Sequence, residues 1–257
     1  MVRFYFLLLL SILAFSSMLN AKEEDIGGSF KSHEAIYHLN MGQVTSSSKI
    51  HNVNGEMHLS VKFVCDGWIV NQNTTIDVTD KNGSQLRNIY RYSTWESKNH
   101  ETLRFMSKVI INGEEVSNYE GKSYIKDGMG KIIFLKPHNK EIDIPVNTLF
   151  PMKHFFISLY ENKVETFFNY VVFTGEDDQS LNNVSSFSKY DIYEKNKYKI
   201  IRSAIYSYND YSSQPENEIE ILVNSKSGVV KKVIFDYLDY QIIGDLQDVQ
   251  YYNEPEC

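Results

Sequence analysis

Few residues in this chain are of the types and spacings that carry catalysis or metal binding. The 257 residues include 2 cysteines, 5 prolines and 7 histidines. There is no Cys-x-x-Cys motif, which argues against a thioredoxin-like redox site, and no Gly-x-Ser-x-Gly, Ser-x-x-Lys, His-Glu-x-x-His or phosphate-binding glycine loop. We therefore expect no catalytic residues, no enzyme activity and no cofactor.

An excess of positive charge is also missing. The chain has 33 acidic residues against 26 basic ones, a net charge of −7. Nucleic acids and anionic lipids attract basic surfaces, so this balance argues against nucleic acid as a partner.

The N-terminus carries the one long apolar run. It extends from Phe4 to Phe15, follows Arg3 and precedes the small residue Ala21. A positive charge, about a dozen apolar residues and a small residue are typical of a secretory signal peptide. A membrane-spanning helix needs about 20 apolar residues, so an anchor is the weaker alternative. We predict a signal peptide over residues 1–21, cleaved near Ala21, and a soluble exported protein with no later membrane span.

From His33 onward the dominant hydrophobic period is two. Met57, Leu59, Val61 and Phe63 alternate with polar residues, which predicts a strand with one buried face. About a dozen such segments predict an all-β fold. The other expected strands include 74–78, 86–92, 107–111, 114–119, 131–136, 165–173, 186–193, 198–208, 219–223, 229–237, 241–243 and 249–252.

Four glycine pairs punctuate these segments. Asn82-Gly83, Asn112-Gly113 and Asp127-Gly128 have the composition of tight hairpin turns, because both residue types tolerate positive φ. Ser227-Gly228 is a fourth predicted turn.

One segment has helical spacing instead. Apolar residues recur from Met152 to Tyr160 at intervals of three and four, after a proline suited to a first helical turn. We predict one helix near residues 150–161, with Pro145 before it as the only plausible domain seam. The favoured organisation is a loose lead-in over 22–32 and a single domain over 33–257.

The two cysteines are Cys65 and Cys257. In an oxidising compartment they can form one intramolecular disulfide, although intermolecular pairing, free thiols and a catalytic cysteine remain alternatives. An intramolecular bond would hold the last strand, near 249–252, against the strand that ends at Cys65.

The remaining polar groups favour structural roles, and we expect no metal site. His33 and His38, like His51 and His58, have odd separations and so fall on opposite faces of a strand. His154, in the predicted helix, is expected to make a structural hydrogen bond. The last two candidates are the acidic run 176–178, expected to be a solvated loop rather than a calcium site, and the pair Asp236 and Asp239, expected to act in a turn rather than as glycosidase carboxylates.

Aromatic residues are abundant, with 18 Tyr, 15 Phe and 2 Trp. Trp68, Trp95 and the Tyr and Phe excess are expected mainly to cover wide sheet faces, with an aromatic ligand groove as the alternative. The sequence does not single out ligand-binding residues.

Several segments, in order, match a known family. They are "HEAIYHL" (33–39), "NGEMHL" (54–59), "CDGW" (65–68), "STWES" (93–97), "LFPMKH" (149–154), "SGVVKKVIFDYLDYQIIGDL" (227–246) and the final cysteine. With these segments the chain resembles the envelope integrity protein B (EipB) family, exported proteins of alphaproteobacteria formerly classed as a domain of unknown function.

The resemblance implies a β-spiral, an open barrel-like antiparallel sheet with a few short helices. It also implies a periplasmic location, a Cys65–Cys257 disulfide and a role in cell envelope integrity without established catalysis. The function expected is binding of another envelope component, which would be a protein, a peptide or a lipid. The alternatives are a lipid or lipoprotein carrier with a half-open β cavity and, third, a cell-wall hydrolase.

Overall fold

The protein is described by a computed structural model, which covers residues 30–160, 165–178, 181–190, 198–208 and 213–257. Within these ranges it forms fourteen strands and one helix, α1 (Pro151–Tyr160). The prediction of an all-β fold with a helix near 150–161 is confirmed. The strands are β1 (His33–Val44), β2 (Ile50–Val64), β3 (Gly67–Asp80), β4 (Gln85–Ser97), β5 (Thr102–Ile111), β6 (Glu114–Lys126), β7 (Met129–Lys136), β8 (Lys140–Ile144), β9 (Glu165–Phe173), β10 (Leu181–Tyr190), β11 (Tyr198–Ser207), β12 (Asn217–Asn224), β13 (Val230–Asp236) and β14 (Tyr240–Tyr251).

The predicted signal peptide (1–21) and most of the predicted lead-in (22–32) lie outside the described residues. Of the helices that the structure describes, none has the length and apolar character needed to cross a membrane.

All fourteen strands belong to one antiparallel sheet in the order β8-β7-β6-β5-β4-β3-β2-β1-β14-β13-β12-β11-β10-β9. Strands that are consecutive in sequence pair with each other, except β8 and β9, and β1 pairs with β14, which joins the two halves. The free edges, β8 and β9, are consecutive in sequence and do not pair with each other. Among the residues that the structure describes, one isolated bridge, Leu149–Val172, links the segment after β8 to β9, and the sheet stays open.

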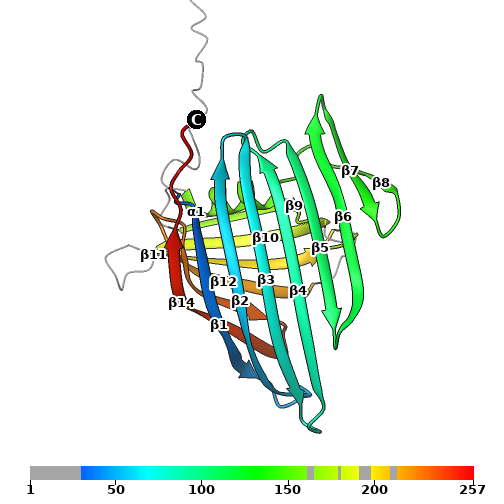
Figure 1. Ribbon diagram of the computed structural model, residues 1–257, viewed down its shortest axis with the longest axis vertical. Coiled ribbons are helices and arrows are strands. Elements are labelled where there is room, and N and C mark those ends of the chain that lie inside the picture. The colour runs from blue at the N-terminus through cyan, green and yellow to red at the C-terminus, as the bar shows by residue number, and fades with distance from the viewer. Residues whose placement is uncertain (1–29, 161–164, 179–180, 191–197, 209–212) are drawn as a thin grey trace, which may run out of the picture.

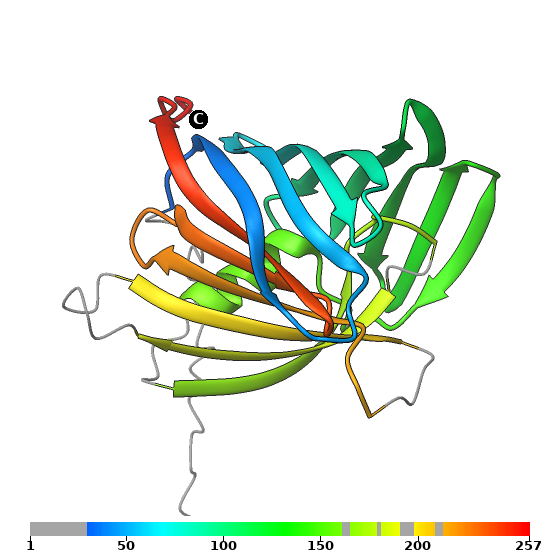
Figure 2. The same cartoon turned by 90° about the horizontal axis from the view of Figure 1, so that it is seen from below.

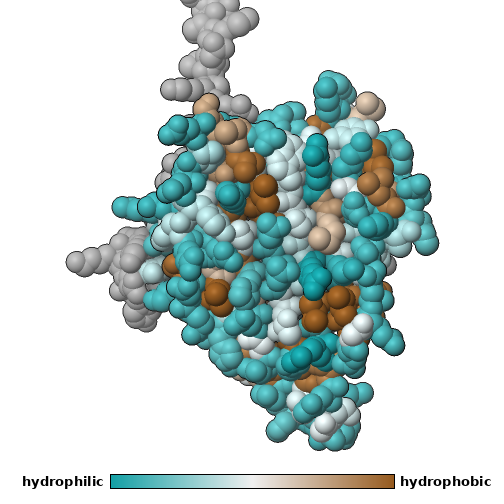
Figure 3. Space-filling model, viewed as in Figure 1, coloured by the Kyte–Doolittle hydropathy of each residue, from teal (hydrophilic) through white to brown (hydrophobic). Residues whose placement is uncertain are grey.

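The sheet curves around its own core. Figure 1 shows β1 to β6 as a front layer with β9 to β12 crossing behind it. Figure 2 shows α1 between these two layers. We call the side of the sheet that faces α1 the inner face. The outer face of the front layer is mostly hydrophilic, with small separate hydrophobic patches (Figure 3).

Aromatic side chains fill the inner face near α1. Phe30, Trp68 and Phe156 are buried together, with Trp68 and Phe156 ring centroids 5.0 Å apart. Leu103, Phe105, Phe134, Phe150 and Phe173 form a second cluster where β5, β7 and β9 approach each other. Trp68 is therefore a core residue, whereas Trp95 lies against Arg104, with the guanidinium carbon 4.9 Å from its ring centroid.

The helix begins under a buried carboxylate. Glu96, on β4, accepts hydrogen bonds from the backbone N–H groups of Met152 (2.8 Å) and Lys153 (3.0 Å). His100 Nδ1 donates to the same side chain at 2.5 Å. Glu96 satisfies donors that a helix N-terminus leaves unpaired and places a negative charge at the positive end of the helix dipole.

The predicted hairpin turns are present. Asn112-Gly113 and Asp127-Gly128 both have positive φ at each residue, as the tightest hairpins require. At Asn82-Gly83 only the glycine has positive φ, and the Asp80 carboxylate accepts the N–H groups of Asn82 and Ser84 instead.

Two expectations about the C-terminal end are wrong. Residues 241–243 and 249–252 do not form separate strands, since β14 runs from Tyr240 to Tyr251 with one register shift against β1 at Ile36/Tyr37 and another at its start. The last strand also does not lie against β2, because β1 lies between them.

The structure joins Cys65 and Cys257 in a disulfide, with Cα atoms 5.5 Å apart and 192 positions between them in sequence. The bond therefore ties the segment after β14, across β1, to the β2–β3 turn. The same segment is also held to Ser32, whose N–H and hydroxyl both donate to the Glu254 carboxylate. The C-terminal residues are thus fastened to the start of β1.

Candidate ligand site on the inner face

The site begins on β4, where alternation directs even-numbered residues to the inner face. Tyr92, Thr94 and Glu96 are buried while Arg91 is exposed, which fixes the direction of this row. Asn88 and Tyr90 continue the row away from α1. The rings of Tyr90 and Tyr92 stack with centroids 6.1 Å apart and planes 12° from parallel.

The loop that follows β9, residues 174–178, crosses this row. The Tyr92 hydroxyl donates to the Thr174 carbonyl oxygen at 2.6 Å, and the Tyr90 hydroxyl donates to Glu176 Oε1 at 3.1 Å. Gly175 between them has φ +77°, and a Cβ there would lie 2.5 Å from Phe105 Cγ. Only glycine allows the loop to approach β5 so closely.

The far end of the loop contacts the edge half of the sheet. Asp178 accepts from the Tyr119 hydroxyl at 3.5 Å and pairs with Lys140 Nζ at 3.4 Å. The sequence led us to expect a solvated loop at 176–178. These residues are exposed, as expected, but their carboxylates also bind the rest of the protein. Residues that belong to β4, β6 and β8 bind these carboxylates.

Three polar atoms, on β4, on β5 and in the loop, lack a hydrogen-bond partner among the described residues: Asn88 Oδ1, Ser107 Oγ and Thr174 Oγ1. Ser107 is 1% exposed and lies opposite Tyr92 in the β4–β5 pairing. Buried polar atoms are nearly always hydrogen-bonded in proteins, so these unpaired atoms are candidate contacts for a bound molecule. We define the inner-face cluster as Asn88, Tyr90, Tyr92, Ser107, Thr174 and Glu176.

The electrostatics of the cluster reflect partial enclosure. The Glu176 side chain is exposed on one side. Its pKa is nevertheless raised, mainly because the protein around the rest of the carboxylate removes part of its solvation. The hydrogen bond from Tyr90 opposes this shift and the charge of Asp177 adds to it. No Lys, Arg or His of the described ranges forms an ion pair with Glu176.

The turn between β13 and β14 lies near the same carboxylate. The pKa of Tyr237 is raised to about 12, mainly by burial and to a smaller extent by the charges of Tyr240 and Glu176. The rings of Tyr237 and Tyr240 stack at 5.2 Å. Tyr237 is 40% exposed, so this side of the cluster is open to solvent.

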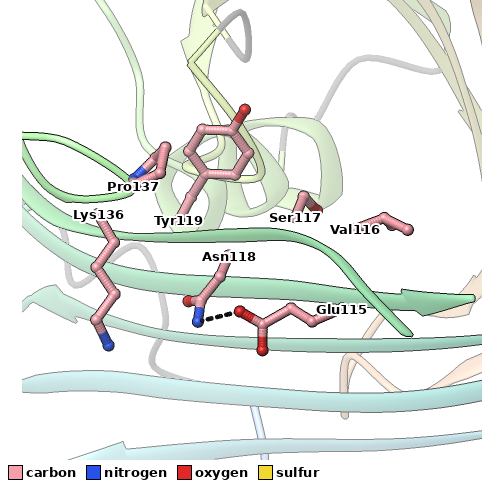
Figure 4. Close-up of a pocket in the computed structure, with 7 residues that line it drawn as sticks. All are labelled: Glu115, Val116, Ser117, Asn118, Tyr119, Lys136 and Pro137. Atoms are coloured by element: carbon pink, nitrogen blue, oxygen red, sulfur yellow. Dashed lines mark hydrogen bonds between the residues drawn. The ribbon is translucent and has the colours of Figure 1, made fainter. Parts of the chain in front are cut away.

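A hollow of about 370 Å³ lies beside the cluster, lined by Glu115, Val116, Ser117, Asn118, Tyr119, Lys136 and Pro137. Figure 4 shows that Tyr119 points to the opposite side of β6 from Lys136 and Asn118. Glu115 and Lys136 already pair with Lys108 and Glu120. The polar groups of the hollow therefore do not converge on one point, which makes the inner-face cluster the better candidate.

A histidine–serine contact exists elsewhere on the inner face. His154 Nε2 lies 3.2 Å from Ser186 Oγ, which also bonds Ser203 at 2.8 Å. Burial lowers the pKa of His154 to about 4, and Ser186 is fully buried beneath α1. The predicted structural hydrogen bond of His154 is confirmed, and a base with so low a pKa is poorly matched to activate a serine at neutral pH.

The other sequence candidates are separate. Asp236 accepts from the Leu238 N–H at 2.9 Å and from Gln241 at 2.7 Å, which confirms the expected turn role. In the described ranges no three His, Cys, Asp or Glu side chains are grouped to hold a metal. The cluster residues were missed because their only sequence signal is the alternation of Tyr90 and Tyr92, which equally fits core packing.

The fold and the cluster define a barrel-like protein made of one open sheet, with a polar site on its inner face. The chain belongs to the EipB-like family, whose model matches residues 25–253. Among solved structures it is similar to the crystal structure of a "beta-barrel-like protein" of a domain of unknown function from Brucella abortus. The TM-score is 0.75 at 19% identity, over 87% of this chain and 99% of that one. No curated protein matches the chain significantly.

Proposed function

We propose that the protein is exported to the periplasm and supports cell envelope integrity by binding another envelope component, without catalysing a reaction on it. Membership of the EipB-like family supports this role. The disulfide supports export, because disulfides persist in oxidising compartments and are rare in the cytosol.

The inner-face cluster is the observation that carries the binding part of the proposal. It combines aromatic rings, a carboxylate without a cationic partner in the described structure, and polar atoms without hydrogen-bond partners there. Such groups are costly to leave unpaired, and a bound molecule would pair them.

The two alternatives gain no observation of their own. A lipid carrier needs a large apolar hollow, whereas α1 and aromatic side chains occupy the inner face beside Trp68. A hydrolase needs an activated nucleophile or an open carboxylate pair, whereas Ser186 is buried and the pKa of His154 is lowered to about 4.

Affinity capture of the tagged protein from its own envelope, followed by protein and lipid mass spectrometry, tests the proposal. Three baits are compared: the unaltered protein, the double variant Glu176→Gln/Tyr90→Phe, and the control Glu114→Gln at the exposed first residue of β6. A component retained by the first and third baits and lost by the second supports binding at the cluster. Recovery of background alone across detergents and salts would contradict the proposal.

Fractionation tests export separately. The protein is expected in the periplasmic fraction, with an N-terminus that begins near Lys22 by mass spectrometry. A cytoplasmic chain that retains residues 1–21 would overturn the proposed location.

A further inference from the structure

We propose that the inner-face cluster binds a primary ammonium group, the charged end of an alkylamine. This inference rests on the proposed binding function and specifies the chemistry of that site. It follows from three properties of the cluster: its charge, its hydrogen-bonding atoms and its rings.

The charge comes from Glu176. Its carboxylate accepts a hydrogen bond from Tyr90 at 3.1 Å, the Thr174 hydroxyl also lies close to it, and no cation of the described structure pairs with it. Lys140, which binds the same loop, pairs with Asp178 instead. A partly desolvated carboxylate without a counter-charge is stabilised most by a cation that comes from outside.

The atoms that remain unpaired favour a ligand with N–H donors. Asn88 Oδ1 and one oxygen of Glu176 only accept, and the hydroxyls of Ser107 and Thr174 can accept as well. A primary ammonium brings three donors and no acceptor. A quaternary ammonium would supply the charge but leave these acceptors unpaired.

The rings supply the rest of the environment. Tyr90 and Tyr92 form one stacked pair and Tyr237 and Tyr240 another, and the charge of Glu176 raises the pKa of Tyr90, Tyr92 and Tyr237, so rings of both pairs lie near this carboxylate. Aromatic faces attract cations through the negative charge of the ring face. Because Glu176 and Tyr237 are exposed, the ligand can enter from solvent.

The test is an NMR chemical-shift titration of the purified protein with two matched probes, n-butylammonium and n-butyltrimethylammonium. The primary amine is expected to shift the resonances of the inner-face cluster and to bind several-fold more tightly than the quaternary one. Equal affinities, or no titration with either probe, would overturn the proposal.

Variants locate the effect. Glu176→Gln keeps an acceptor for Tyr90 but removes the charge. It should weaken the binding of n-butylammonium by about tenfold or more, which corresponds to the loss of one charge-assisted hydrogen bond. Tyr90→Phe keeps the ring and should cost much less. The control Glu114→Gln should bind as the unaltered protein does. Unchanged affinity in Glu176→Gln would contradict the assignment; if that variant does not fold, the two-probe comparison on the unaltered protein decides.

Two further probes distinguish the sources of such a group. Putrescine represents a free polyamine and phosphoethanolamine a lipid headgroup, and the tighter binder identifies the source. The outcome is separable from the proposed function. If the ammonium probes fail while the unaltered bait still retains a component that Glu176→Gln/Tyr90→Phe loses, the cluster binds a ligand of other chemistry and only this inference falls.

Discussion

The inner-face row of β4 meets two different environments at its two ends. At the α1 end, Glu96 is buried against the helix and accepts its N-terminal N–H groups, and the rings of Trp68 and Phe156 pack against each other. At the other end, Tyr90 and Tyr92 meet an acidic loop, and their hydroxyls bond to it. Inward aromatic residues thus form a core where a helix covers them and a partly exposed polar site where a loop does. The first end should hold the fold together, and the second should be free to bind.

The largest difference between the two ends is expected when a ring is removed at the α1 end and only a hydroxyl at the other end. Phe156→Ala removes a fully buried ring and should lower the free energy of unfolding by about 3–5 kcal/mol. Tyr90→Phe, at the other end, should change it by less than about 1 kcal/mol. Urea denaturation of both variants measures this, and equal losses would erase the distinction.

The disulfide between the β2–β3 turn and the C-terminus should also stabilise the folded protein. Cys257→Ser should cost about 2–4 kcal/mol, because the bond closes a long loop in the unfolded chain. Chemical denaturation with and without reductant measures the cost. A companion mass measurement decides the pairing itself: alkylation without prior reduction should leave the unaltered chain at its original mass.

The carboxylate above α1 comes next. Glu96→Gln keeps the shape but weakens three charge-assisted hydrogen bonds, and we expect a loss of about 1–3 kcal/mol. The matched Glu176→Gln change should not lower stability. A Glu96→Gln protein as stable as the parent would show that the helix does not depend on this carboxylate.

Acid should affect the two ends with opposite sign. Burial lowers the pKa of His154 from 6.5 to about 4, so the folded state binds fewer protons than the unfolded chain between these values. Stability is therefore lost as pH falls through this window, by about 3 kcal/mol at most. His154→Gln should flatten the loss, which unfolding curves between pH 7 and pH 4 would show.

Glu176 should act in the reverse direction, with the smallest effect. Its raised pKa means that the folded state binds more protons than the unfolded chain just above the ordinary value, so ionisation slightly destabilises the fold. Glu176→Gln should be marginally more stable near neutral pH, and the gain should vanish below the ordinary glutamate pKa. A clear loss of stability would mean that this carboxylate serves the fold.

Local patterns predicted much of the architecture. Alternation at Met57–Phe63 and the glycine turns at Asn112 and Asp127 marked strands and hairpins, and helical spacing after Pro151 marked α1. The position of β1 between β2 and β14 was not predictable, because pairing between distant segments leaves no local periodicity. The register shifts that keep residues 240–251 in one strand are equally silent in sequence.

The candidate site was harder to predict than the fold. In sequence, the acidic run that contains Glu176 looks like any solvated loop. Only the course of residues 174–178 in the folded protein brings this loop to Tyr90 and Tyr92. Unpaired atoms such as Ser107 Oγ depend on neighbours that come from other strands. No single segment encodes them.

The protonation of Glu176 tests the central distinction most directly. Carbon-13 NMR can follow its carboxyl group through a pH titration in the free protein and with n-butylammonium added. The pKa should lie above the ordinary glutamate value in the free protein and fall when the probe is present, because a bound cation favours the charged carboxylate. An ordinary pKa that the probe does not move would mean that the inner-face cluster is not a binding site for this group.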